Sequence, residues 1–144
     1  MPTLPETKAC KVNIENEWLT ISFNQPEKRN ALTSELTADI KNIFDAARDD
    51  LSVRGVTMRG EGGIFCAGGD LYSFSNSGHN LINEVREFIV SLHGAISKFC
   101  RIKAPIIASI NGVAAGAGLS FASFPSFAIA SENATFVSSY TNVG

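Results

Sequence analysis

The sequence predicts a single α/β domain in which two strands come first and strands then alternate with helices. Three observations lead to this prediction. Several segments alternate apolar and polar residues with the period of two that is typical of strands. Longer segments place apolar residues every three or four positions, as amphipathic helices do. Glycine, proline and asparagine separate these segments, and together they give the order β-β-α-β-α-β-α-β-β.

The first elements along the chain are a hairpin, a helix and a strand. Apolar and polar residues alternate through 11–24 on both sides of Asn16 and Glu17, which indicates a β-hairpin. After a loop over 25–30, Thr33 or Ser34 is placed to cap a helix. The apolar face of that helix is formed by Leu36, Ile40, Phe44 and Ala47. A short strand is expected over 53–60.

A second helix is predicted from Asn80, as its N-cap, to Arg101. Its apolar residues recur at helical spacing, so they share one face that packs on the rest of the domain. They are Val85, Ile89, Leu92, Ile96 and Phe99. The step to Pro105 ends this helix, because proline cannot continue the backbone hydrogen bonding.

The last third of the sequence predicts a strand, a helix and two further strands. Residues 106–110 (IIASI) indicate a buried strand. A third helix is expected to begin near Gly116 and to run toward Phe124, where the next residue is a proline. Residues 127–131 and 134–138 are predicted as short strands.

Composition places the chain among globular proteins that bind neither nucleic acid nor membranes. It has 144 residues, 44% hydrophobic and 18% charged, which is enough for one domain with a core. The net charge of −2, with both signs mixed, gives no support for a basic binding surface. No apolar run has the length of a membrane helix, and the N-terminus lacks the apolar region of a secretory signal. We therefore expect a cytoplasmic protein.

Cysteine and histidine give no sign of a metal centre. Cys10, Cys66 and Cys100 are far apart and form no CxxC pair, and His79 and His93 have no metal-ligand spacing. We expect reduced thiols and no metal. Cys66, inside IFCAG, is interpreted as a buried filler rather than a nucleophile. His93 is interpreted as structural or exposed.

Two glycine-rich stretches, 62–74 (GGIFCAGGDLYSF) and 111–120 (NGVAAGAGLS), each lie between a strand and a helix. Glycine weakens helices and strands, so such clusters indicate a tight bend or a close approach. The first N–H groups of a helix lack internal partners, and two facing turns would offer two donors to a developing oxyanion. Each turn is also compatible with a simple tight connection. A phosphate cradle is a third option, although the third glycine of the dinucleotide fingerprint and a GK[ST] step are missing.

Three blocks, NQPEKRNALT, GGIFCAGGDL and KAPIIASINGVAAGAGLSFA, resemble the enoyl-CoA hydratase/isomerase family, also called the crotonase family, in order and spacing. The resemblance implies a spiral of β-β-α turns that is truncated before the C-terminal helical region. It implies an N-terminal tail over 1–10 and an incomplete acyl-CoA-binding core over 11–144. A homo-oligomer, trimer or hexamer, is implied for the full-length protein, with an acyl-CoA thioester as substrate and no separate cofactor.

Family members stabilise the enolate that forms at a thioester carbonyl. Residue by residue, the resemblance implies that the N–H groups of Gly69 and Ala117 are the two oxyanion-hole donors. It also implies six residues at the coenzyme A entrance and beside its adenine and pantetheine: Lys28, Arg29, Ala31, Ala67, Asp70 and Leu71. From the residues alone, the two basic side chains are equally compatible with solvated loop charges. The aspartate is better interpreted as a helix cap or loop anchor than as a catalytic acid.

The sequence departs from the hydratases of this family at two positions. Hydratases use two carboxylates to activate one water, and the corresponding residues here are Ser120 and Tyr140. Neither hydroxyl is a good general base near neutral pH. An isomerase needs one base, which in isomerase members follows the segment matching residues 140–144. We therefore expect an isomerase-type enzyme that is inactive and marginally stable as the 144-residue chain alone; a hydratase and a non-catalytic acyl-CoA binder are the alternatives.

Overall fold

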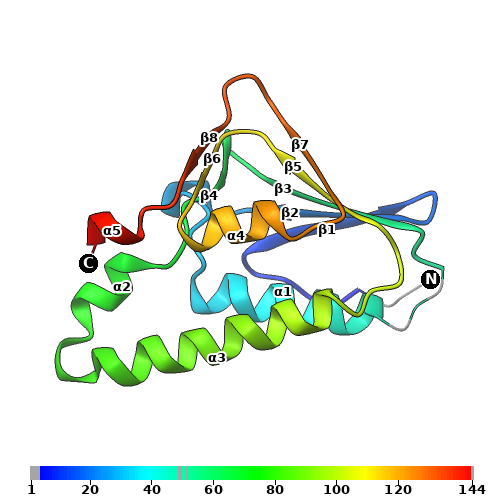
Figure 1. The fold of residues 1–144 in the computed structure, drawn as a ribbon. Coiled ribbons are helices and arrows are strands. Elements are labelled where there is room, and N and C mark those ends of the chain that lie inside the picture. Colours follow the sequence, from blue (N-terminus) through cyan, green and yellow to red (C-terminus); the bar gives the residue numbers. More distant parts are fainter. Residues whose placement is uncertain (1–3, 49, 51, 144) are drawn as a thin grey trace.

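Figure 1 shows the chain as a computed structural model, which describes residues 4–48, 50 and 52–143. Within these residues the strands form two sheets, one of five strands and one of three. The larger sheet contains, in spatial order, β1 (Cys10–Glu15), β2 (Trp18–Phe23), β3 (Gly55–Gly60), β5 (Ile106–Ile110) and β7 (Phe127–Ala130). The smaller sheet contains β4 (Ile64–Cys66), β6 (Val113–Ala115) and β8 (Thr135–Val137). The predicted mixed α/β class is confirmed.

The predicted hairpin is present as the antiparallel pair β1 and β2, with Glu15 opposite Trp18. The two turn residues, Asn16 and Glu17, have φ angles of 50° and 65°, both in the left-handed region. This is the backbone of a two-residue hairpin turn whose twist matches that of the strands. Every other strand pair in the two sheets is parallel.

Two long helices, α1 (Ser34–Arg48) and α3 (Leu81–Phe99), lie side by side along the larger sheet (Figure 1). The rings of Phe44 and Phe99 pack edge to face with centroids 4.7 Å apart. An ion pair between Lys98 and Asp45 also joins the two helices. The C-terminal half of α3 is therefore fixed to α1 by both apolar and charged contacts.

A smaller helix, α4 (Ala117–Ser123), packs against β4, β5 and β6 and so links the two sheets. The core at this junction is aromatic. The ring of Phe23 lies 5.6 Å from that of Phe65 and 6.2 Å from that of Phe121, and all three side chains are fully buried. Because β2, β4 and α4 each supply one ring, this cluster holds the smaller sheet against the larger one.

The predicted helix starts differ in how they are capped. The Leu36 N–H donates to Thr33 Oγ1 at 3.1 Å, so Thr33 caps α1. Asn80 precedes α3 as predicted, but its side chain makes no cap hydrogen bond and instead donates to Glu84 Oε1 at 3.2 Å. A short 3-10 turn, η2 (Gly78–Asn80), leads into the helix and replaces the expected cap.

Several short elements are absent from the sequence prediction. These are the strands β4 and β6, the 3-10 turn η1 (Pro26–Lys28), and the helices α2 (Leu71–Asn76) and α5 (Tyr140–Val143). A strand of three residues is too short for apolar periodicity to reveal it. The predicted range of α3 was also too long, because the helix ends at Phe99 rather than Arg101.

The N-terminal segment is attached to the domain before residue 11. The carboxylate oxygen Oδ2 of the buried Asp39 accepts the N–H groups of Lys8, Ala9 and Cys10 at 2.8, 2.6 and 3.0 Å. Three donors offset the cost of burying that oxygen. Residues 8–10 are therefore part of the fold, whereas the sequence predicted a tail over 1–10; residues 1–3 lie outside the described residues.

The sheets are buried unevenly. In β5 the side chains of Ile106, Ala108 and Ile110 are buried, which confirms the predicted buried strand. In β7 and β8, by contrast, every residue is exposed, including Phe127 at 64% and Phe136 at 51%. Among the described helices, none combines the length and apolarity needed to cross a membrane.

Candidate functional site

The two glycine-rich stretches meet at one edge of the smaller sheet. β4 and β6 are parallel neighbours, with Ile64 paired to Val113, so the segments that follow them leave the sheet side by side. A β-carbon at Gly68, where φ is 96°, would lie 2.7 Å from the carbonyl oxygen of Ala115. Glycine at this position permits both the backbone conformation and the close approach of the second turn. The close approach that the glycines predicted is therefore made by the protein itself.

Backbone hydrogen bonds fix both turns. The carbonyl of Gly68 accepts the Leu32 N–H at 2.7 Å, and the Gly116 N–H donates to the Val137 carbonyl at 2.9 Å. The residues that follow these glycines are Gly69 and Ala117. Among the described residues, no hydrogen bond from the N–H of Gly69 or Ala117 is found. Ala117 is the first residue of α4, where an N–H has no partner inside the helix.

Gly69 and Ala117 both line one cavity of about 410 Å³. The opposite walls come from α2 and α3 and are apolar; they consist of Leu71, Phe74, Val85, Phe88, Ile89 and Leu92. Among the described residues, the polar side chains of the lining are His93, Ser139 and Tyr140, and none of the lining residues is a carboxylate. An apolar cavity with two unpaired donors suits a ligand whose oxygen gains negative charge, because low polarity strengthens such hydrogen bonds.

Four of the residues predicted for the site line this cavity: Gly69, Ala117, Ala67 and Leu71. Lys28 and Arg29 do not; both are exposed, and Arg29 has a left-handed backbone at the end of η1. The Ala67 N–H nevertheless donates to the Arg29 carbonyl at 3.1 Å, which holds this basic turn beside the cavity wall. Ala31, also predicted at the entrance, is buried and lies outside the lining.

Asp70 is a helix cap. Its Oδ1 accepts the Ser73 N–H at 3.2 Å at the start of α2, and its side chain lines a different cavity. This confirms the interpretation of Asp70 as a cap. A role beside coenzyme A remains a prediction for this residue.

The two positions that carry carboxylates in hydratases are separated here. Tyr140, the first residue of α5, lines the same cavity as Gly69 and Ala117. Ser120 is exposed on α4 and does not belong to the lining. The residues seen in this cavity therefore offer one phenol and no carboxylate near the two N–H groups.

Cys66 is a buried filler, as predicted. Its side chain is fully buried at the end of β4. Burial raises the pKa of the Cys66 thiol to about 12, because the apolar surroundings disfavour the thiolate. A thiol that stays protonated is a poor nucleophile.

His93 is exposed, as one of the two interpretations proposed, but it also lines the cavity. The sequence did not lead us to expect His93 in the lining of this cavity. The signal was available, since Val85, Ile89 and His93 follow one another at intervals of four and so lie on one stripe of α3. All three residues line the cavity.

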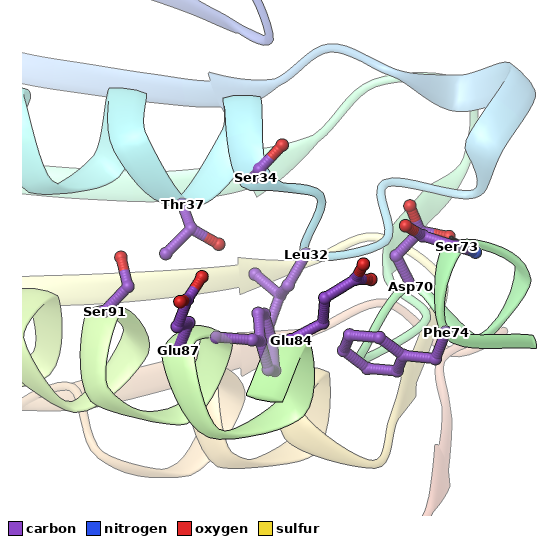
Figure 2. A pocket seen from close by; sticks show the side chains of 10 residues that line it. Leu32, Ser34, Thr37, Asp70, Ser73, Phe74, Glu84, Glu87 and Ser91 are labelled. Atoms are coloured by element: carbon purple, nitrogen blue, oxygen red, sulfur yellow. Dashed lines mark hydrogen bonds between the residues drawn. The ribbon is translucent and has the colours of Figure 1, made fainter. Parts of the chain in front are cut away.

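A second cavity, of about 360 Å³, lies between α1, α2 and α3 (Figure 2). Its polar residues are Ser34, Thr37, Asp70, Ser73, Glu84, Glu87 and Ser91. Three carboxylates disfavour an oxyanion at this place. Within the described part of the chain, no cluster of three or more His, Cys, Asp or Glu side chains is arranged to hold a metal ion.

Comparison with known proteins identifies a family. The sequence profile of the enoyl-CoA hydratase/isomerase family matches residues 13–144. A 4-chlorobenzoyl coenzyme A dehalogenase of Arthrobacter is 30% identical over 126 residues, which are 87% of this chain and 46% of that protein. A 1,2-epoxyphenylacetyl-CoA isomerase of Escherichia coli is 29% identical over 136 residues, covering 92% of this chain and 51% of that protein.

Solved structures show the same fold. The crystal structure of an enoyl-CoA hydratase from Polaromonas superposes with a TM-score of 0.88 at 36% identity. The superposition covers 95% of this chain and 53% of that one. The chain thus spans about half the length of the curated relatives and solved structures that it matches.

Proposed function

Because the chain belongs to the enoyl-CoA hydratase/isomerase family, we propose that it is an isomerase-type acyl-CoA enzyme that acts through a thioester enolate. The N–H groups of Gly69 and Ala117 bind the enolate oxygen in this proposal. The observation that supports it best is that Gly69 and Ala117 line one apolar cavity and that no acceptor for either N–H group is found among the described residues. The reaction is a double-bond shift or a related isomerisation.

The two donors lower the barrier because they bind the oxyanion more strongly than the neutral carbonyl. Removing one such donor typically costs about 2.7–4 kcal/mol of transition-state stabilisation. Backbone donors require little of the side chains except small size, which Gly69 and Ala117 provide. Their positions are fixed by the hydrogen bonds of Gly68 and Gly116, so little reorganisation is needed when charge develops.

Isomerisation is favoured over hydration by the composition of the cavity. Hydration requires groups that hold a water and move its protons, and paired carboxylates do this in the family's hydratases. The lining seen here has no carboxylate, and Ser120 lies outside it. A hydratase remains the second candidate within the same family, and an acyl-CoA binder without catalysis is the third.

Coenzyme A is bound as part of the substrate in this proposal, and no separate cofactor takes part. Lys28 and Arg29 are exposed on a turn that is hydrogen bonded to Ala67 in the cavity wall. Cationic side chains at this place suit the phosphate groups of coenzyme A. Leu71 and Ala67 would then contact the pantetheine chain on its way to the two donors.

The proposal is tested with Ala117→Pro, which removes one donor. Proline is tolerated at the first position of a helix, so α4 is retained. We expect affinity for 3-oxobutyryl-CoA, whose enolate places charge on the thioester oxygen, to fall about 100-fold. Affinity for butyryl-CoA, measured by the same calorimetry, should fall much less. Ala117→Gly keeps the N–H and serves as the matched control; equal losses for both ligands in Ala117→Pro would contradict the oxyanion assignment.

A further inference from the structure

Within the described part of the chain, the cavity lined by Gly69 and Ala117 contains a single imidazole, that of His93. Enolate chemistry needs a group that removes a proton from the carbon next to the thioester and later returns it. Histidine is the residue type that exchanges protons most readily near neutral pH. The other polar side chains in the lining are the hydroxyls of Ser139 and Tyr140, and its remaining residues are apolar or glycine.

Helix α3 places His93 in this cavity. Val85, Ile89, Leu92 and His93 form one stripe of the helix, and all four line the cavity. Leu92 and Ala95, on either side of His93 in the sequence, are buried, which fixes the rotation of the helix about its axis at this point. The Lys98–Asp45 ion pair and the contact of Phe99 with Phe44 fix its end one turn later.

The imidazole is not engaged by other groups. Within the described residues, no hydrogen bond or ion pair of His93 is found. Tyr140 of α5 is the other titratable side chain in the same lining. The carboxylates Asp70, Glu84 and Glu87 line the second cavity instead (Figure 2). Phe74 and Phe88 contribute to the walls of both cavities.

Resting on the proposed function, we propose that His93 is the catalytic residue that transfers the proton, in place of the base that the resemblance predicted after residues 140–144, so that the 144-residue chain itself exchanges protons. With a 3-enoyl thioester, the bond between the α-carbon and its hydrogen breaks and the proton passes to an imidazole nitrogen. The electron pair moves into the enolate, whose oxygen is held by the N–H groups of Gly69 and Ala117. Return of the same proton to the γ-carbon moves the double bond, and neither an oxidant nor a reductant is required.

The experiment follows the exchange of the α-protons of butyryl-CoA in D₂O by proton NMR. This substrate forms the enolate without further reaction, so the proton transfer is observed by itself. We expect His93→Gln to slow the exchange by about 100-fold or more, the usual size of a general-base contribution. Binding of butyryl-CoA should change less than about threefold. His79→Gln is the matched control, because His79 is exposed in η2 and lies outside both cavities.

Two further readouts separate catalysis from a structural role. The exchange rate of the wild-type chain should rise with pH, and this rise should be absent in His93→Gln. Added imidazole should restore exchange to His93→Ala. Unchanged exchange in His93→Gln together with its loss in Ala117→Pro would overturn the role of His93 and leave the proposed function intact. Binding without exchange in the wild-type chain would also overturn it, and absence of acyl-CoA binding would overturn both proposals.

Discussion

Gly118 in α4 contacts the carbonyl oxygen of Cys66 in β4 so closely that a β-carbon at Gly118 would lie 2.1 Å from that oxygen. The two residues belong to the two glycine-rich stretches of the sequence. Their contact brings the start of α4 against the end of β4, and so places Ala117 beside the turn that carries Gly69. The contact of Gly118 with the backbone of Cys66 therefore holds the second glycine-rich turn against the first.

Gly118→Ala should lower the free energy of unfolding by about 1–3 kcal/mol, the usual cost of forcing extra volume into a packed site. The backbone of Cys66 cannot move aside as a flexible side chain would. Gly94→Ala is the control, because nothing lies within 4 Å of a β-carbon there, and alanine in mid-helix should stabilise α3 by up to about 1 kcal/mol. Urea unfolding measures both; equal stabilities for the two variants would show that α4 can shift freely.

Alkylation of the native chain at pH 8 should modify Cys100 and spare Cys10 and Cys66. Cys100 is exposed, whereas the other two thiols are buried. Burial raises the pKa of both buried thiols, that of Cys66 to about 12, so the reactive thiolate is scarce. Mass spectrometry should find one modified cysteine in the folded chain and all three in urea. Rapid modification of native Cys66 would indicate that β4 opens often.

Crotonyl-CoA should not be hydrated. Ser120 and Tyr140 are the residues predicted at the two carboxylate positions of hydratases, and the cavity lining formed by the described residues contains no carboxylate. The assay is loss of the ultraviolet absorbance of the conjugated thioester, in the 144-residue chain and in a chain extended through the rest of the family fold. Turnover at rates usual for enzymes, roughly 1 to 1,000 per second, would identify a hydratase.

Two threonines of the first helical turns should respond oppositely to valine. Thr33 caps α1 and donates to Gln25 Oε1 at 2.8 Å, so Thr33→Val should cost about 1 kcal/mol or more. Thr37 Oγ1 is buried without a hydrogen-bond partner in the described structure. Thr37→Val removes that unsatisfied group at nearly constant shape, so stability should hold or rise by about 1 kcal/mol. A loss of stability in Thr37→Val, measured by thermal unfolding, would indicate that Thr37 Oγ1 has a hydrogen-bond partner such as water.

The 144-residue chain should self-associate through its exposed strands. β7 and β8 are edge strands, and Phe127, Ile129, Phe136 and Val137 are 40–64% exposed on them. Contiguous apolar surface of this kind favours association. The sedimentation coefficient should rise with concentration, and less so in Phe127→Ser/Phe136→Ser. Tyr72→Ser, which removes an aromatic side chain exposed on α2, is the control; equal behaviour of both variants would place the contact elsewhere.

The sequence by itself determined the fold class, the family and most long elements. Apolar periodicity identified the hairpin, α1, α3 and β5, because each is long enough for a period to repeat. The glycine blocks indicated an anion site, since turns at helix starts leave N–H groups unpaired. The family resemblance then predicted Gly69 and Ala117 as its donors. Elements of three to six residues, such as β4, β6 and α2, left no such pattern, and their existence depends on pairing and packing with distant segments.

Only the tertiary structure decided which side chains share the cavity. His93 and Ala117 are 24 positions apart, and nothing in their local sequences indicates that α3 passes the start of α4. Packing of α3 on α1, through Phe99 and Lys98, sets that path. Of the two residues predicted at the carboxylate positions of hydratases, only Tyr140 lines the cavity, and Ser120 is exposed outside it. The residue types in a turn or on a helix suggest hydrogen-bond donors and bases, but long-range packing decides which of them line the same cavity.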